Sequence, residues 1–379
     1  MRVKKLRRYG LHLFLFLLTL ATTTISGGEW AAGKLFFFSQ QGFEPGGTFT
    51  AADWHQGFLF SLTFLLVLTV HEFGHYFTAR FYNIKVTLPY YIPMYFVITN
   101  SLGTMGAFIR IKERIFSRKE FFDVGVAGPL AGLAIALPLL FYAYTHLPPP
   151  EYIFSIHPEY AKYGLDYAQH VYQNPENQIY LGKNLMILFF ENFVADPALL
   201  PPKYEIIHYP LLMAGYLSLI LTALNLLPVG QLDGGHVLYG LLGFERFNRI
   251  APVIFVLFIG YAGLGIITPD INVIEDYWFI LVYVFYLLLV FQKIVPQRRQ
   301  AYLLAAGVIG FQLAFSFLWP GISGYPGWLL FGLILSRALG VHHPPCADER
   351  PLSTGRKALG WLALLFFVLC FSPTPFVVE

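Results

Sequence analysis

The sequence has few charged residues for its length and only two cysteines. Aspartate, glutamate, lysine and arginine make up 12% of its 379 residues, whereas about a quarter of the residues in a soluble protein are charged. A hydrophobic share of 56% excludes a disordered chain and an ordinary water-soluble globule. Cys346 and Cys370 alone predict no disulfide framework. The formal net charge of +3 gives no support to nucleic-acid binding.

Apolar segments that approach the thickness of a lipid bilayer are abundant instead. The sequence therefore predicts an all-α polytopic membrane protein with eight to nine transmembrane helices. The first helix is expected to be an uncleaved signal anchor, because basic residues precede it and no cleavage site stands out. If the N-terminus is cytoplasmic, most of the 25 lysines and arginines fall on the cytoplasmic face, which agrees with the positive-inside rule. The expected segments are residues 10–26, 56–79, 121–145, 207–227, 250–267, 277–292, 301–319, 327–341 and 358–371.

These segments divide the chain into three expected regions. Residues 1–55 hold the signal-anchor helix and an outer loop. Residues 56–245 form a catalytic membrane core, which includes the outer loop 146–206, and residues 246–379 form the C-terminal transmembrane helices. A basic N-terminus without a long serine-rich leader favours the inner membrane of a bacterium over a plastid membrane.

The strongest chemical pattern in the sequence is HEFGH in the second apolar segment. His71 and His75 are four residues apart, and Glu72 follows the first of them. On a helix this spacing puts both imidazoles on one face. Two neutral imidazoles can then bind one Zn²⁺, and Glu72 is close enough to accept a proton from water at the metal. The structural alternative is that the histidines hydrogen-bond neighbouring helices and Glu72 stays protonated.

A zinc site needs a third protein ligand, and the segment around Asp233 offers one. Pro228, Gly230 and the two glycines after Asp233 interrupt an apolar run, and unwound backbone at membrane depth persists only where protein or a polar cavity satisfies it. Asn225 could donate to an oxyanion on a substrate carbonyl, or its amide could hold two helices together. His236 is a fourth ligand or a hydrogen-bonding neighbour of the ligands, and the second role is favoured because a hydrolase keeps one position open.

Together the two segments resemble the site-2 protease family of intramembrane zinc metalloproteases. HEFGH at 71–75 and NLLPVGQLDG at 225–234 are similar to the family's HExxH and NxxPxxxxDG motifs. GVAGPLAG at 125–132 is similar to the family's glycine-rich span, in which small residues allow helices to approach closely. The resemblance covers the core from about residue 56 to 240.

The C-terminal region and the outer loop point to one subgroup of that family. Residues 342–356, with the spans beside them, resemble the PDZ-less subgroup, which includes plant chloroplast and bacterial members. The loop 146–206 is too short and has too few glycines for the PDZ domain that many relatives insert between their motifs. We therefore expect no PDZ domain in this chain.

The resemblance implies hydrolysis of peptide bonds within or near the transmembrane segments of membrane-protein substrates. His71, His75 and Asp233 would hold one catalytic Zn²⁺. Glu72 would accept a proton from the attacking water and then donate it to the leaving amine, and Asn225 would stabilise the oxyanion. The expected partners are transmembrane substrates and the lipid bilayer, and the sequence does not determine an oligomeric state.

Substrate helices hide their peptide bonds, so the enzyme must hold them unwound. β-Branched and aromatic residues in segment 95–114 surround two glycines, and this segment resembles the family's membrane-associated β-hairpin. A free strand edge there would pair with an extended substrate through Gly103, Thr104, Met105 and Gly106. The alternative is an ordinary connector between two spans.

Two other functions are consistent with some of these residues. A metal-ion transporter would use the histidines and Asp233 as a translocation site, but transporters usually spread polar residues along a pathway and often contain internal repeats, and this sequence shows neither. A membrane protease of the prenylated-peptide type would take a glutamate further along the chain as its third ligand, for which Glu245 is the candidate.

Overall fold

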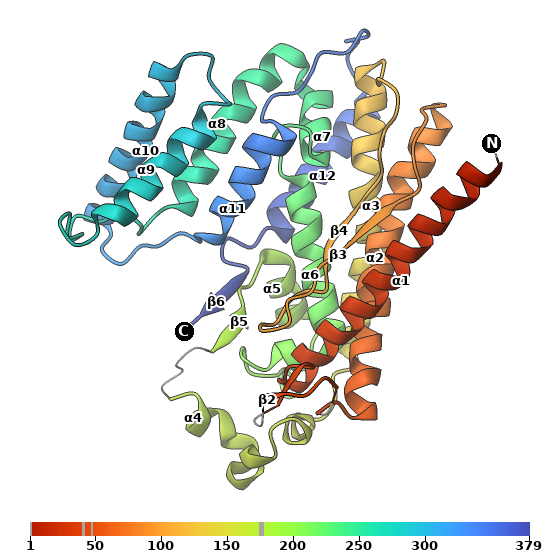
Figure 1. The fold of residues 1–379 in the computed structure, drawn as a ribbon, viewed down its shortest axis with the longest axis vertical. Coiled ribbons are helices and arrows are strands. Elements are labelled where there is room, and N and C mark those ends of the chain that lie inside the picture. Colours follow the sequence, from red (N-terminus) through yellow and green to blue (C-terminus); the bar gives the residue numbers. More distant parts are fainter. Residues whose placement is uncertain (1, 40–41, 47, 174–177) are drawn as a thin grey trace. The chain divides into compact units, whose positions relative to one another are not determined.

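A computed structural model describes residues 2–39, 42–46, 48–173 and 178–379 and is mostly helical, as Figure 1 shows. The chain divides into two compact units. Unit 1 consists of Met1–Arg114, Ala127–Leu224 and Phe366–Glu379. Unit 2 consists of Ile115–Val126 and Asn225–Leu365.

The elements follow this division along the chain. Those that begin in unit 1 are α1 (Arg2–Ala32), β1 (Phe38–Ser39), β2 (Gly42–Phe43), α2 (Ala51–Phe81), β3 (Tyr90–Pro93), β4 (Thr104–Phe108), η1 (Pro150–Ser155), η2 (Pro158–Asp166), α4 (Tyr167–Val171), β5 (Ile179–Leu181), α5 (Leu185–Phe193), η3 (Ile206–His208), α6 (Pro210–Leu226) and β6 (Phe376–Val378). Those that begin in unit 2 are α3 (Arg118–Thr145), α7 (Asp233–Leu242), α8 (Phe244–Ala262), α9 (Tyr277–Phe291), α10 (Arg298–Leu318), α11 (Gly327–Ile334), η4 (Leu335–Leu339) and α12 (Thr354–Cys370).

Each of the nine apolar segments expected from the sequence contains a helix. Among the described residues, four helices are long and apolar enough to cross a membrane: Tyr9–Ala32 within α1, then α2, α3 and α10. Shorter apolar helices cover Pro210–Leu226, Tyr277–Phe291 and Gly327–Leu339. The chain is therefore an integral, multi-pass membrane protein, and a count of eight or nine spans stays a prediction.

Helix α2 carries the HEFGH motif and has well-defined ends. At its start Thr50 accepts a hydrogen bond from the Asp53 backbone, and the Asp53 carboxylate accepts one from the Thr50 backbone at 2.6 Å. This reciprocal pair is a capping box, which satisfies backbone donors that the first turn leaves unpaired. The helix ends before Asn83, whose φ of 58° is the left-handed conformation common after helices. Its 31 residues span about 46 Å, longer than a hydrocarbon core of about 30 Å.

Small residues bring α1 against α2 in unit 1, where the two helices lie side by side (Figure 1). A side chain on Gly57 would meet the Gly28 backbone nitrogen at 2.7 Å. Nearby, the hydroxyl oxygens of Thr23 and Ser61 are 2.5 Å apart. Close backbone approach through small and hydroxyl residues is how helices associate in a membrane, so α1 is an integral component of this unit.

The predicted β-hairpin forms, but its first strand lies earlier than expected. Strand β3 pairs antiparallel with β4, and Tyr91 lies opposite Ala107. The expected segment began at residue 95, which lies in the connection between the two strands. In the described residues neither strand pairs with a third one, and β3 contacts α1. The hairpin therefore keeps an edge on which another strand could form hydrogen bonds.

The loop between α3 and α6 is built from short helices over a buried core. Its described residues contain η1, η2, α4, α5, η3 and the single strand β5, which pairs with the C-terminal strand β6. Leu140, Met213 and Leu219 are almost fully buried in the core beneath it. One strand is too little for a PDZ domain, so this segment of the chain agrees with the expected PDZ-less organisation.

In unit 2, charged side chains tie the ends of helices together. Arg356 of α12 donates two hydrogen bonds to the Asp123 carboxylate of α3, at 2.8 and 2.9 Å. Arg118, at the start of α3, is buried and donates to the Gly240 carbonyl oxygen at 2.9 Å. Both arginines bridge segments far apart in sequence: Arg118 joins the start of α3 to the last turn of α7, and Arg356 joins α12 to α3.

Candidate metal centre

The two histidines of HEFGH converge as the helical spacing predicts. The Nε2 atoms of His71 and His75 are 3.1 Å apart, and the Oε1 atom of Glu72 lies 4.0 Å from Nε2 of His71. All three residues are buried, with exposed fractions of 3%, 4% and 7% in sequence order. Three ionisable groups are therefore gathered in the apolar body of a membrane-length helix, where they need a compensating partner.

Glycines of α3 make room for both imidazoles within unit 1. A Cβ atom on Gly128 would lie 2.5 Å from two ring carbons of His75. A Cβ on Gly132 would lie 3.3 Å from the His71 Cβ, and one on Gly74 would meet the Ala127 carbonyl oxygen at 2.6 Å. The glycine-rich motif was expected to allow close helix approach. In the structure its glycines leave room for the ligand side chains, because the His75 ring lies directly against the backbone of Gly128.

This pair of imidazoles fits a zinc ion. A tetrahedral ion with bonds of about 2.05 Å to nitrogen holds two donors about 3.3 Å apart. The observed separation of 3.1 Å between the two Nε2 atoms is close to that value. Neutral imidazoles suit zinc and other transition metals better than magnesium or calcium. The α2 residues could therefore supply two ligands of a zinc site.

The segment before Asp233 in unit 2 leaves helical geometry, as expected. Helix α6 ends at Leu226 and α7 begins at Asp233, so residues 227–232 are not helical. Gly230 has a φ of 61°, a conformation that favours glycine. A Cβ on Gly235 would lie 2.8 Å from the Val229 carbonyl oxygen. The glycines of this motif therefore let the start of α7 pack directly on the loop that precedes it.

The structure places the remaining candidate residues of this motif as follows. Asp233 is the first residue of α7 and is partly buried, and a helix N-terminus favours a negative charge. Asn225 lies in the last turn of α6 and is also partly buried. Glu245, the rival ligand, has a side chain that is 82% exposed and lies 3.7 Å from Arg249. A surface glutamate of this kind is a poor candidate for a buried metal site.

His236 is oriented by a residue whose role the sequence did not reveal. Its Nδ1 atom lies 2.9 Å from Nε2 of His343, and Nδ1 of His343 donates to the Pro344 carbonyl oxygen at 2.7 Å. Burial lowers the pKa of His343 to about 4, so that ring is neutral, and its Nε2 accepts the His236 proton. This hydrogen bond fixes the orientation of the His236 ring, and its role as a hydrogen-bonding neighbour of the ligands stays a prediction. Only the HHPP sequence at 342–345 hinted at this contact.

The four hairpin residues expected to bind substrate have different surroundings. Gly103 has a φ of 77°, and its carbonyl oxygen accepts a hydrogen bond from the Thr22 hydroxyl at 2.7 Å. Thr104 is buried and donates to the Ile92 carbonyl oxygen at 2.8 Å. Met105 is 59% exposed. The last of the four, Gly106, has a φ of 103°. The glycines and Thr104 shape the hairpin, whereas the Met105 side chain is available for contact.

Residues 59–266 match the family model described as "Peptidase family M50". The match covers more than half of the chain and contains both motifs. This chain belongs to peptidase family M50. The family includes the site-2 proteases, so the resemblance stated from the two motifs is confirmed.

Curated plant proteins are similar to this M50 chain. "Probable zinc metalloprotease EGY2, chloroplastic" of Oryza sativa subsp. indica is 27% identical over 217 residues, which are 57% of this chain and 34% of that protein. The corresponding EGY1 protein of Oryza sativa subsp. japonica is 30% identical over 179 residues, 47% of this chain and 27% of its own. The chain spans about a third of the length of these relatives. No solved structure matches, and chloroplastic relatives give no support to the expected bacterial membrane.

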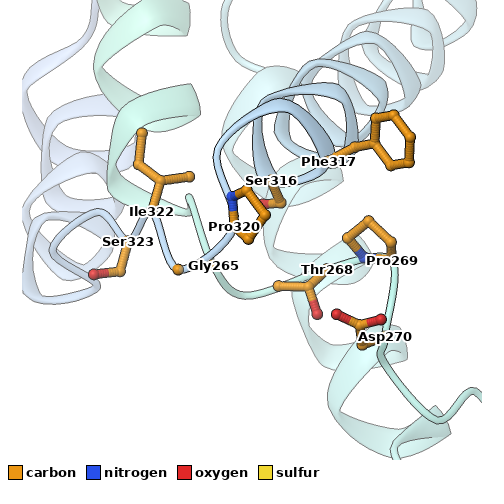
Figure 2. Close-up of a pocket in the computed structure, with 10 residues that line it drawn as sticks. Gly265, Thr268, Pro269, Asp270, Ser316, Phe317, Pro320, Ile322 and Ser323 are labelled. Atoms are coloured by element: carbon orange, nitrogen blue, oxygen red, sulfur yellow. The ribbon is translucent and has the colours of Figure 1, made fainter.

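A cavity of about 490 Å³ lies in unit 2. Figure 2 shows that Thr268, Pro269 and Asp270 from the chain after α8 line it, together with Ser316 and Phe317 from the end of α10. The sequence-predicted site residues are absent from its described lining.

Proposed function

We propose that this M50 protein is a zinc-dependent endopeptidase that hydrolyses peptide bonds within or near the transmembrane segments of other membrane proteins. The observation that carries the proposal is the buried pair of imidazoles in α2, whose Nε2 atoms are 3.1 Å apart beside Glu72. The names of the relatives, zinc metalloproteases, support the same chemistry. A protease whose ligands lie inside an apolar helix meets its substrate in the bilayer.

In this proposal His71, His75 and Asp233 bind the ion. When bound, Zn²⁺ supplies Lewis-acid activation of water and of the scissile carbonyl. Glu72 accepts the proton that the attacking water loses and passes it to the nitrogen of the leaving amine. Its burial keeps competing solvent away from that carboxylate. Asn225 donates its amide hydrogen to the oxygen of the substrate carbonyl as negative charge develops there.

The hairpin of β3 and β4 provides a surface for an unwound substrate. A substrate strand would add to the hairpin edge by backbone hydrogen bonds, at Gly103, Thr104, Met105 and Gly106. Met105, more than half exposed, would contact a substrate side chain directly. Hydrogen bonds to the substrate backbone do not depend on the substrate's side chains, so this mode of binding would suit an enzyme that cleaves several single-span proteins.

The organisation of the chain into three regions also belongs to the proposal. Residues 56–245 would form the catalytic core, preceded by the signal-anchor region of residues 1–55 and followed by the C-terminal helices of residues 246–379. We place the shorter apolar helices α6, α9 and α11, together with α8 and α12, across or partly across the bilayer, which gives eight or nine spans. The lysines and arginines concentrated on one side of these spans support that topology.

The experiment that tests the function compares the parent protein with Glu72→Gln. We expect Glu72→Gln to retain zinc but to lose activity by about a hundredfold to ten-thousandfold, because a general base is removed while the ligands remain. Quantitative proteomics of membranes should show intact single-span proteins accumulating in cells that carry Glu72→Gln. Glu275→Gln, a change at an exposed glutamate in the loop before α9, is the matched control.

The outcomes separate the peptidase from a transporter. Purified protein reconstituted in liposomes should cleave an accumulating substrate and should carry no zinc flux. Two results together would favour the transporter over the peptidase. One is an unchanged membrane proteome, and the other is a zinc flux that His71→Ala abolishes. The zinc metalloproteases to which this chain is similar give that alternative no support.

A further inference from the structure

A second group of metal-ligating side chains lies in the loop between α3 and α6, entirely within unit 1. His157, between η1 and η2, meets Glu205 and His208 of the segment just before α6. One ligand atom from each of the three residues lies within 4.8 Å of the other two. Two histidines and one glutamate form a donor set typical of zinc. The group is separate from HEFGH in sequence and does not participate in the proposed proteolysis.

Hydrogen bonds determine which nitrogen of His208 is available. Its Nδ1 atom lies 2.9 Å from the Trp30 carbonyl oxygen and 3.1 Å from that of Ala31. Carbonyl oxygens only accept, so Nδ1 carries the proton. In a neutral ring with its proton on Nδ1, Nε2 carries the lone pair. A histidine that binds a metal through one nitrogen commonly donates the other to a backbone carbonyl.

His157 presents a second lone pair to the same point. Its Nδ1 atom lies 3.4 Å from the Glu159 carboxylate, which favours the proton on Nδ1. The Nε2 atoms of His157 and His208 are 3.3 Å apart. In these tautomers two nitrogen lone pairs face each other, and a cation between them would remove the repulsion.

Glu205 contributes an oxygen that lacks a hydrogen bond. Its side chain is only 1% exposed. One oxygen, Oε1, accepts a hydrogen bond from the Tyr172 hydroxyl, whereas Oε2 is buried without a hydrogen-bond partner. This Oε2 atom lies 3.7 Å from Nε2 of His208, too far for a hydrogen bond. A buried carboxylate oxygen without a donor needs a compensating group, and one carboxylate oxygen of Glu205 lies within 4.8 Å of a ring nitrogen of each histidine.

We propose that Nε2 of His157, Nε2 of His208 and Oε2 of Glu205 bind one zinc ion, in addition to the proposed catalytic one. A tetrahedral zinc ion would hold such donors about 3.3 Å apart. Two of the observed separations, 3.3 and 3.7 Å, are close to that value, and ligand atoms of all three residues lie within 4.8 Å of one another. The His157 side chain is 25% exposed, so the ion can enter from that side. Since His208 also bonds to the end of α1, the ion would hold this loop on α1.

The test measures zinc per chain in the purified full-length protein by elemental mass spectrometry. The parent should hold two zinc ions. Glu205→Gln and His157→Gln should each reduce this number to one, whereas His170→Gln, at an exposed histidine of the same loop, should leave two. A variant with His71→Ala and His75→Ala should also keep one, and adding Glu205→Gln to it should remove the last ion.

Thermal unfolding distinguishes loss of the ion from loss of the fold. After treatment with EDTA, the parent and His157→Gln should unfold at the same temperature, because His157 lies at the partly exposed side of the group. Zinc chloride should then raise the unfolding temperature of the parent more than that of the variant. If neither Glu205→Gln nor His157→Gln changes the zinc content, the two histidines share a plain hydrogen bond and the proposal is wrong. That result would not affect the proposed peptidase function. Failure of the peptidase function would appear separately, in the Glu72→Gln experiment.

Discussion

Replacing Gly128 by alanine should disable the metal site without altering a ligand. A Cβ atom on Gly128 would lie 2.5 Å from Cδ2 and from Cε1 of His75. Carbon atoms in van der Waals contact are about 3.5 to 4.0 Å apart, so the overlap amounts to about 1 Å. The His75 ring or the α3 backbone must move by that distance to accept the methyl group.

A shift of this size is large compared with the tolerance of a zinc site. Bonds from zinc to imidazole nitrogen measure about 2.0 to 2.1 Å, and a sound site keeps them within about 0.2 Å. We therefore expect Gly128→Ala to lower zinc affinity by about tenfold to a hundredfold, the cost typical of disturbing the residues around metal ligands. Peptidase activity should fall by at least about a hundredfold, because a misplacement of about 1 Å at a reacting centre has that effect.

Two other glycines provide graded controls for this variant. Gly132→Ala places its Cβ 3.3 Å from the His71 Cβ, which requires a shift of only a few tenths of an ångström, so its effect should be smaller. Gly307 in α10 has open space around it, and Gly307→Ala should change neither zinc content nor activity. Zinc per chain and cleavage rate are measured on the same preparations. If Gly128→Ala retains zinc and cleaves within about twofold of the parent, the confinement of His75 by α3 is refuted.

Four further variants test other regions of the molecule. Asp233→Asn should lower the zinc content measured by elemental analysis, whereas Glu245→Gln should leave it unchanged. The opposite result would identify Glu245 as the third ligand. Met105→Asp should keep zinc but reduce kcat/KM by about tenfold, because a charge replaces an apolar contact of about 1.4 kcal/mol with the substrate; an unchanged kcat/KM would remove the hairpin from substrate binding. Gly230→Ala should destabilise the protein by more than about 1 kcal/mol, since a left-handed conformation costs about that much for other residues and its Cβ would press on the Gly340 backbone. If Gly230→Ala unfolded at the same temperature as the parent, this expected loss of stability would be contradicted.

Local sequence determined the features of the site that lie on one element. The convergence of His71 and His75 follows from a four-residue spacing on a helix, and the low charge of α2 is visible in the sequence. The break before Asp233 was equally predictable, because Pro228 and the glycines cannot continue a helix without cost. The β-hairpin was expected from the resemblance of segment 95–114 to the family's hairpin, although the start of β3 was not.

Contacts between segments far apart in sequence were beyond that reasoning. The purpose of Gly128 depends on the position of His75, and the orientation of His236 depends on His343, 107 residues away. The group of His157, Glu205 and His208 has no motif spacing, since 51 residues separate the two histidines. Nothing in the sequence predicts that the His343 ring is neutral, because its pKa depends on burial by the surrounding chain.

The sequence by itself therefore determined that this is a helical membrane protein with the motifs of an M50 peptidase, because hydropathy and motif spacing act over one or two helical turns. Only the tertiary structure decided which backbone presses on His75, how the hairpin rests against α1, and where the unpaired oxygen of Glu205 is directed. Those features arise from packing between distant segments, and packing is set by the whole fold rather than by any one stretch of residues.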